Sequence, residues 1–304
     1  MKIVKETKCY NYKTLTNDLR YLQFEYPIFE IKSIGKTILG KNIFCVTLGK
    51  GPKKIMINAS HHANEWITTL ILLMFMENYM SLYTKKENRK GYQIAELWER
   101  ASLYLVPMVN PDGVDLVLGD KTTQNEPSYQ SIWKPYQDQL NRWKANLRGV
   151  DLNLNYPAGW DMARKNKGKK GVIKPGPRDY VGPNPLSELE TRAMCRLTML
   201  HRFDMTISLH SQGEEIYWNY HGYQNQRAYE IGKLFEKVSG YQLTTPAATS
   251  SFAGYKDWFI QEYHKPGYTI EMGKGEEEIS LPLSQAKQIY EQVEEIFWVA
   301  LAEV

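Results

Sequence analysis

The sequence has few cysteines and no long apolar run, and both absences exclude classes of protein. Its 304 residues include three cysteines, Cys9, Cys45 and Cys195, and none of them forms a C-x-x-C pair. Neither a disulfide framework nor a thiolate zinc site is therefore indicated. The apolar run at residues 71–76 is far too short to span a bilayer. Charged residues interrupt the N-terminal segment, so that no signal peptide is visible and a cytoplasmic protein is expected.

A strong excess of one charge sign is also missing. The chain has 38 basic and 34 acidic residues and a net charge of +4. This balance does not indicate nucleic acid as a partner, although it would suit a small anionic substrate. Hydrophobic residues make up 42% and charged residues 24%, which is the composition of a soluble globular enzyme. Neither an internal repeat nor a linker is visible, so that one domain over 1–304 is expected.

Segments with strand and helix patterns alternate along the chain, which is typical of an α/β fold with a mostly parallel or mixed sheet covered on both faces. Asn110-Pro-Asp-Gly113 predicts a turn, and Ser187 with Glu190 predicts a helix N-cap. The polar stretch 114–183 has little periodicity and predicts an irregular functional surface or a mobile loop. Strands are expected at 42–49, 54–59, 103–109, 205–209 and 268–272, and helices at 13–25, 65–83, about 188 to 201, 226–238 and 284–302.

Two histidines and a glutamate have the spacing and the positions of metal ligands. His62 and Glu65 follow the expected strand 54–59, where α/β sheets place their functional groups. Residues at i and i+3 lie on one side of a helical turn and can share a metal ion. His210 ends a second strand and would complete a His2Glu set, the ligand pattern of catalytic zinc. The alternative for the first pair is a surface histidine beside a glutamate that favours the helix dipole.

Glu271 is a lone carboxylate inside the apolar strand 268–272. Burying a carboxylate is costly unless it has a partner or a function. Zinc lowers the pKa of bound water to about 7, and a neighbouring glutamate can accept the proton. A salt-bridged core glutamate is the alternative. The sequence leaves that alternative open, but it contains all the residue types that metal-assisted hydrolysis needs.

The motifs around these residues resemble the zinc carboxypeptidase family, which includes the pancreatic carboxypeptidases. The resemblance runs from about residue 10 to the C-terminus. It implies a single α/β domain with a central eight-stranded mixed sheet flanked by helices, and one Zn2+ per chain. The motifs, which follow the family's order, are His62-x-x-Glu65-Trp66-Ile67-Thr68, Asn110-Pro111-Asp112-Gly113, Gly149-Val150-Asp151-Leu152-Asn153, Ser208-x-His210-Ser211, Lys256-Asp257-Trp258 and Ile270-Glu271.

The resemblance also implies a role for individual residues. His62, Glu65 and His210 match the family's zinc ligands. Glu271 matches the general base that activates water and later protonates the leaving amine. Asp151 matches a carboxylate that orients the first histidine, although a turn aspartate is an equally good explanation of that residue from the sequence.

The departures from the family's pattern concern substrate binding. Asn153 is kept, but Leu154 stands where the family has the arginine that binds the substrate's C-terminal carboxylate. Lys144 stands at the position where the family has the arginine that polarises the scissile carbonyl. A lysine can also stabilise the developing negative charge, although it lacks the planar guanidinium of arginine. Arg142 or Arg148 could fill that space instead.

Two further positions differ from the family. Thr249 falls where members have the tyrosine that caps the substrate site, and Tyr255 is a candidate substitute. Asn64 replaces another arginine of the binding groove. A general digestive carboxypeptidase is therefore disfavoured.

The residues around His62, Trp143 and His210 resemble one bacterial subgroup, the γ-D-glutamyl-L-diamino acid endopeptidases. This implies cleavage of peptidoglycan stem peptides between D-glutamate and a diamino acid, meso-diaminopimelate. The chain lacks the cell-wall-binding repeats of some relatives, so that a free enzyme acting on released muropeptides inside the cell is expected, with neither nucleic acid nor membrane as a partner. The sequence leaves the oligomeric state open. The alternatives are a metallocarboxypeptidase for ordinary peptides and an inactive binder of wall peptides, against which Glu271 argues.

Substrate contacts are predicted from charge and position. Arg178 and the lysines of 165–170 could bind substrate carboxylates, with a solvated loop as the alternative for the lysines. Glu214 or Glu215 could receive the amine of a diamino acid. The predicted catalytic residues are Glu271 and Lys144, and the predicted substrate-binding residues are Asn153, Arg148, Arg178, Gln212, Gly213, Glu214 and Asp257.

Overall fold

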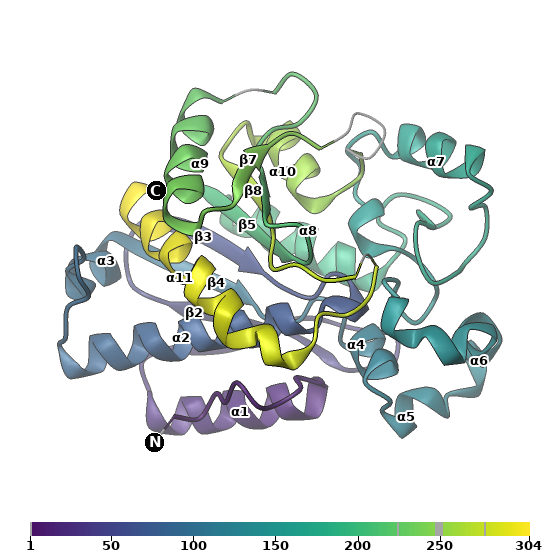
Figure 1. The fold of residues 1–304 in the computed structure, drawn as a ribbon, viewed down its shortest axis with the longest axis horizontal. Coiled ribbons are helices and arrows are strands. Elements are labelled where there is room, and N and C mark those ends of the chain that lie inside the picture. Colours follow the sequence, from purple (N-terminus) through teal and green to yellow (C-terminus); the bar gives the residue numbers. More distant parts are fainter. Residues whose placement is uncertain (1, 224, 247–251, 277) are drawn as a thin grey trace.

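The computed structural model describes residues 2–223, 225–246, 252–276 and 278–304. These residues form an eight-stranded sheet with the strand order β1-β2-β4-β3-β5-β8-β6-β7, and helices pack around it (Figure 1). The pairs β4–β3, β3–β5, β5–β8 and β6–β7 are parallel. The pairs β1–β2, β2–β4 and β6–β8 are antiparallel. The sheet is mixed, which confirms the expected fold class. Its strands are β1 (Glu30–Lys36), β2 (Asn42–Leu48), β3 (Lys53–Asn58), β4 (Ala101–Val106), β5 (Met205–His210), β6 (Glu215–Tyr217), β7 (Gln242–Thr244) and β8 (Gly267–Glu271).

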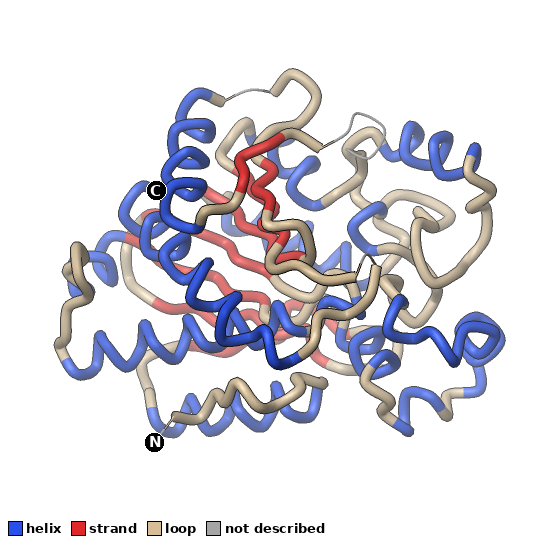
Figure 2. Tube along the Cα trace, viewed as in Figure 1, coloured by secondary structure: helices blue, strands red, loops and turns tan. Residues whose placement is uncertain are grey.

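Helices cover both faces of the sheet (Figure 2), because successive side chains of a strand point to opposite faces. Ile55 and Ile57 of β3 belong to one buried cluster, and Met56 between them belongs to another. The first cluster contains residues of α1 (Tyr12–Glu25), α2 (Ile67–Lys85), α3 (Ile94–Arg100), α9 (Gln226–Ser239) and α11 (Ala286–Glu303), and the second contains residues of α8 (Leu189–His201) and α10 (Tyr255–Tyr263).

Helix α2 anchors the loop that carries His62 and Glu65. Its residues 67–77 are all buried, as expected of a helix that is apolar on every side. The ring of Phe75 lies 4.6 Å from that of Phe297 and 5.1 Å from that of Trp298, measured between centroids. Truncating Phe75 to alanine would cost about 3–5 kcal/mol of stability. Within the described residues, no helix, α2 included, has the length and apolarity that crossing a membrane requires.

The stretch 114–183 contains more helix than predicted. It includes most of α4 (Pro111–Val117), then α5 (Lys121–Gln124), α6 (Pro127–Trp133) and α7 (Trp160–Lys169), with 3-10 turns η2 (Lys134–Arg142) and η3 (Leu152–Leu154). The turn predicted at 110–113 is wrong. Asn110 Oδ1 accepts a hydrogen bond from Gly113 N at 3.0 Å, and Pro111 occupies the first turn, so that the motif opens α4. Lys165, Lys167 and Lys169 lie in the second half of α7 rather than in a loop, and Lys170 is its C-cap.

The N-cap predicted for α8 is also wrong. Glu188 is the cap residue and its side chain makes no capping hydrogen bond; the Ser187 hydroxyl instead donates to Glu188 Oε1 at 2.8 Å. The other predicted helices and strands are present within a few residues. The prediction missed β1, β6, β7, α3 and α10, together with the short 3-10 turns η1 (Ala63–Glu65) and η4 (Leu283–Gln285).

Candidate active site

Three parallel strands end at one edge of the sheet, and each brings a candidate residue there. β3 ends at Asn58 and leads into the turn that carries His62. β5 ends at His210 and β8 ends at Glu271. The register of β5 and β8 places His210 directly opposite Glu271. This is the edge at which parallel sheets form their sites.

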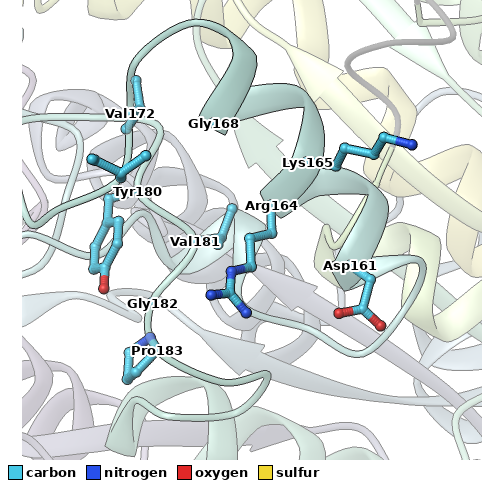
Figure 3. A pocket seen from close by; sticks show the side chains of 10 residues that line it. Asp161, Arg164, Lys165, Gly168, Val172, Tyr180, Val181, Gly182 and Pro183 are labelled. Atoms are coloured by element: carbon cyan, nitrogen blue, oxygen red, sulfur yellow. The ribbon is translucent and has the colours of Figure 1, made fainter.

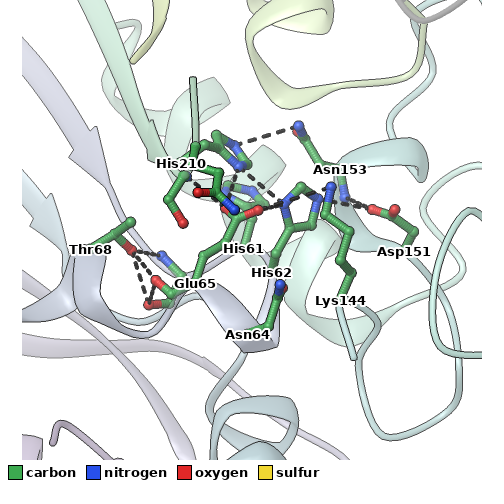
Figure 4. Close-up of polar contacts among 12 residues, drawn as sticks. His61, His62, Asn64, Glu65, Thr68, Lys144, Asp151, Asn153 and His210 are labelled. Atoms are coloured by element: carbon green, nitrogen blue, oxygen red, sulfur yellow. Dashed lines mark hydrogen bonds and ion pairs between the residues drawn. The ribbon is translucent and has the colours of Figure 1, made fainter. Parts of the chain in front are cut away.

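The side chains of His62, Glu65 and His210 converge on one point (Figure 4). Nδ1 of His62 lies 2.7 Å from Glu65 Oε1 and 3.2 Å from Nδ1 of His210. Nδ1 of His210 lies 2.9 Å from Glu65 Oε2. All three side chains are buried, and their ligand atoms lie within 4.8 Å of one another. The three residues are therefore close enough to share one metal ion.

The chemistry of this group fits a cation. Nε2 of His62 lies 3.2 Å from Asp151 Oδ1, and an ionised carboxylate can only accept there. Nε2 therefore carries the proton, and Nδ1 directs a lone pair toward Glu65 and His210. Several electron pairs then point at one buried position, which only a proton or a metal ion can stabilise. Two imidazoles and one carboxylate are a ligand set of catalytic zinc, so the residues fit that metal.

The electrostatics of the site favour positive charge at the same position. Burial lowers the pKa of His62, but the carboxylates of Glu65 and Asp151 outweigh it and raise the pKa to about 9. Burial also raises the pKa of Glu65 and of Asp151, yet the neighbouring His62 and other cationic groups hold both pKa values well below their usual range. The two carboxylates are therefore ionised around neutral pH.

The loop that carries Lys144 is tied to the loop that carries His62. The carbonyl of Lys144 accepts a hydrogen bond from Ala63 N at 3.0 Å. The side-chain amide of Asn110 donates to the carbonyls of His61 and Ala145, each at 3.2 Å. Because Asn110 is the fully buried cap of α4, both loops are held against a rigid helix.

A cavity of about 490 Å³ opens beside these groups. The ammonium of Lys144 reaches into the site, with Nζ 3.9 Å from Glu65 Oε1. Burial raises the pKa of Glu271, although the charge of His210 opposes this. The residues that were predicted from the sequence and lie in the cavity wall are His62, Lys144, Asp151, Asn153, Lys167, Arg178, Asp257 and Glu271.

The other predicted substrate-binding residues lie outside that wall. Arg148 Nε is 3.8 Å from Glu188. Gln212 donates from Nε2 to the carbonyls of residues 276 and 279, and Gly213 N donates to the carbonyl of residue 273. The carboxylate of Glu214 pairs with Lys274 at 2.5 Å. Each of these residues therefore has at least one polar contact within the chain.

The proposed substitute for the capping tyrosine is not available. The hydroxyl of Tyr255 lies 2.7 Å from Thr198 Oγ1 and is fully buried, so it cannot reach a substrate. The prediction made for Thr249 lies outside the described residues. Asn64 donates to the carbonyl of Glu278 at 3.2 Å, and the Glu278 carboxylate lies 2.5 Å from Arg178 Nη1. Arg178 therefore has a carboxylate partner inside the chain.

The basic stretch 165–170 divides between two places. Lys167 Nζ lies 2.6 Å from Asp179 Oδ1, and both residues line the cavity of the candidate site. Lys165 instead lines a second cavity of about 390 Å³, together with Arg164 and Tyr180 (Figure 3). Of the residues that line the second cavity, Lys165 is the one that the sequence had offered as a candidate, and the other lining residues carry no predicted role.

Among the residues of the main cavity wall that the sequence analysis did not select are Lys256 and Tyr217. Lys256 is 5% exposed and stands with Asp257 in an otherwise apolar stretch around Trp258. A lone charge pair in such a stretch is the signal that could have identified it, since buried charges need a partner or a function.

The family of the chain follows from its likeness to known proteins. A family model described as Zinc carboxypeptidase matches residues 15–297. The chain belongs to the zinc carboxypeptidase family. It is therefore a zinc metallopeptidase, as expected from the sequence motifs.

Individual relatives extend over the whole chain. It is 37% identical over 301 residues to γ-D-glutamyl-L-diamino acid endopeptidase 1 of Lysinibacillus sphaericus, a match that covers 99% of this chain and 74% of the relative. It is 36% identical to protein YqgT of Bacillus subtilis, over 98% of this chain and 78% of that protein. The crystal structure of thrombin-activatable fibrinolysis inhibitor shares the fold, with a TM-score of 0.78 at 17% identity over 100% of this chain and 77% of that one.

Proposed function

We propose that the protein hydrolyses the amide bond between the γ-carboxyl of D-glutamate and a diamino acid, meso-diaminopimelate, in peptidoglycan stem peptides. The observation that carries this proposal is the 37% identity to a γ-D-glutamyl-L-diamino acid endopeptidase along 99% of the chain. The cavity supports it. Leu154 offers no guanidinium for a C-terminal carboxylate, whereas Arg178 brings a cation from another part of the chain to bind a carboxylate of a stem peptide.

We assign the zinc to His62, Glu65 and His210. When bound, zinc supplies Lewis acidity, which polarises the scissile carbonyl and makes water a better nucleophile. Asp151 accepts a hydrogen bond from Nε2–H of His62 at 3.2 Å, which keeps the Nδ1 lone pair free for the metal and fixes the plane of the ring.

Glu271 and Lys144 provide the remaining chemistry. Glu271 accepts a proton from the attacking water while the new C–O bond forms, and gives it to the amide nitrogen while the C–N bond breaks. Burial raises the pKa of this carboxylate, which makes it a stronger base than an exposed glutamate. The ammonium of Lys144 stabilises the negative charge that develops on the carbonyl oxygen. Each proton and charge of the reaction thus has a place among residues of the cavity wall.

Three predicted residues of the wall are proposed to contact the substrate. Asn153 lies beside the proposed zinc ligands, because its Nδ2 is 3.5 Å from Nε2 of His210. Its Oδ1 accepts a hydrogen bond from Tyr255 N at 3.0 Å. Arg178 would bind a carboxylate, and Asp257 would accept hydrogen bonds from an ammonium group.

We also propose that the enzyme acts on muropeptides in the cytoplasm. The supporting observation is that Cys9, Cys45 and Cys195 are all unpaired thiols, as is usual in a reducing compartment.

The test is mass spectrometry of the zinc-loaded protein incubated with L-Ala-γ-D-Glu-meso-diaminopimelate, with and without a chelator. Release of free diaminopimelate that the chelator abolishes is the expected result. An ordinary tripeptide with a free C-terminal carboxylate is the comparison substrate. Cleavage of that peptide alone would make the protein a conventional metallocarboxypeptidase, and cleavage of neither by zinc-loaded protein would make it a binding protein.

A further inference from the structure

The first turn of α10 carries two opposite charges side by side in the cavity wall. Lys256 is 5% and Asp257 is 6% exposed. Nζ of Lys256 lies 2.6 Å from Asp257 Oδ1 and 2.6 Å from the carbonyl oxygen of Asn219. Both residues line the same cavity as Glu271. The pair is therefore nearly removed from solvent, yet it faces the space that a substrate would occupy.

The fold brings this pair close to the reacting groups. Helix α10 packs against β8, the strand that ends at Glu271. Thr269 lies two residues before Glu271, so both side chains point to the same face of the sheet, and both line the cavity. The wall thus continues from Glu271 along β8 to the start of α10.

The contacts of the pair leave hydrogen-bonding capacity unused. An ammonium group has three protons, and the hydrogen bonds of the described residues use two of those on Lys256. The same bonds use one of the two carboxylate oxygens of Asp257. Burying an ion pair is unfavourable unless the remaining hydrogen-bonding groups are also satisfied. A ligand that brings an acceptor to Lys256 and a donor to Asp257 would satisfy both.

We propose that Lys256 and Asp257 together bind an amino-acid head group, in which an ammonium and a carboxylate share one carbon atom. The proposal rests on the proposed function, in which the leaving group is a diamino acid. Lys256 binds the carboxylate at the far end of that group, and Asp257 binds the ammonium next to it. The site therefore selects a diamino dicarboxylic acid, such as meso-diaminopimelate, over lysine, which has the distal amine without the distal carboxylate.

The first arm of the test changes the substrate and leaves the protein intact. Kinetics are measured for L-Ala-γ-D-Glu-X, where X is meso-diaminopimelate, meso-diaminopimelate amidated at the distal carboxylate, or L-lysine. The expected result is that kcat/KM falls by about 50-fold or more for the last two, because a polar site rejects a ligand that leaves its buried charge unpaired. Equal kcat/KM values for all three would overturn the proposal while leaving the proposed function in place.

The second arm changes the pair. Lys256→Met should reduce the preference for diaminopimelate over lysine to less than about threefold, chiefly through KM, and Lys256→Arg should restore part of it. Lys287→Met is the matched control, since its side chain is 70% exposed on α11. A purely structural ion pair would lower activity on both substrates and keep their ratio, which would contradict the proposal. Should Lys256→Met fail to fold, the substrate series decides alone.

A binding measurement separates this proposal from the proposed function. Free meso-diaminopimelate is titrated into the wild-type protein by calorimetry, with L-lysine as the comparison ligand. If none of the three peptides is cleaved by zinc-loaded protein, the proposed function fails. Binding of diaminopimelate but not lysine would then still support the pair as a head-group site, and binding of neither would overturn it.

Discussion

The carboxylate of Asp151 lies 3.2 Å from Nε2 of His62, while Nδ1 of the same ring lies 2.7 Å from Glu65. The ring is therefore held from both sides, by the Asp151 carboxylate that accepts a hydrogen bond from Nε2–H and by the Glu65 carboxylate that lies where a metal would bind. Asp151 also accepts a hydrogen bond from Asn153 N at 3.1 Å, so that its own position is fixed by the turn it caps.

Replacing Asp151 with asparagine should weaken zinc binding by about 10–100-fold, because the neutral amide no longer enforces the required tautomer of His62. Zinc affinity is measured by competition with a chromophoric chelator. Asp161→Asn, at an exposed position of α7, serves as the control and should bind zinc like the wild type. Unchanged affinity in Asp151→Asn would show that the contact with His62 is not what holds the ring.

Glu271→Gln should lower kcat by about 10²–10⁴-fold, the usual contribution of a general base, because the amide cannot accept the water proton. Glu271 is not part of the converging group formed by His62, Glu65 and His210, so that zinc content should stay at one per chain. Single-turnover kinetics and metal analysis of the same preparation test both statements. Wild-type turnover in this variant would remove Glu271 from the mechanism.

Removing zinc should lower the melting temperature as well as the activity. A ligand that binds only the native state stabilises it by about 2.7 kcal/mol when its free concentration is 100 times Kd. The side chains of His62, Glu65 and His210 converge on one buried position in the native state, so that zinc binds the folded protein in preference to the unfolded chain. Differential scanning calorimetry before and after chelation, followed by zinc readdition, measures the change. An identical melting temperature in all three states would contradict the assigned ligands.

Lys144→Met should lower kcat/KM by about 10²–10³-fold, as expected when one group that stabilises an oxyanion is lost. The backbone contact of Lys144 with Ala63 does not depend on the side chain, so that zinc binding should be retained. Lys144→Arg keeps the charge and should recover much of the loss. Steady-state kinetics of the two variants are compared; equal losses in both would indicate that shape rather than charge matters at this position.

Glu190 in α8 should make stability depend on pH. Burial, with the charges of Glu188 and Asp112, raises its pKa from 4.5 to about 8. The native state therefore holds a proton that the unfolded chain releases, so the free energy of unfolding falls as pH rises between these two values. Glu190→Gln cannot titrate, and its stability relative to the wild type should increase across that window. Urea unfolding at both ends of the window tests this, and parallel behaviour of the two proteins would contradict it.

The sequence predicted the parts of the site that follow from strand ends. His62, Glu65 and His210 were expected to meet because parallel strands finish at one edge, and their atoms do lie together. Side-chain direction on a helix was not predictable in the same way. Tyr255 was considered as a substrate contact, but α10 turns its hydroxyl toward Thr198.

Other differences arise because one pattern suits two structures. Asn-Pro-Asp-Gly is typical of a turn, yet the same asparagine and proline also suit the start of a helix, and the buried position of Asn110 selects the helix. Strands β6 and β7 have three residues each, too few for a periodic pattern, and they exist through pairing with β8 and with each other. Lys256 received no role from the sequence beyond its place in the Lys256-Asp257-Trp258 motif, because its burial appears only in the folded chain.

The amide of Asn110 has a consequence for the precision of the catalytic geometry. The groups that must cooperate on one carbonyl, Lys144 and His62, are far apart along the chain, and uncertainty in their separation would normally accumulate over every intervening residue. Asn110 shortens that path to a pair of hydrogen bonds from one fully buried side chain. The helices of the intervening excursion can therefore vary in length and sequence while the spacing of the reacting groups stays the same.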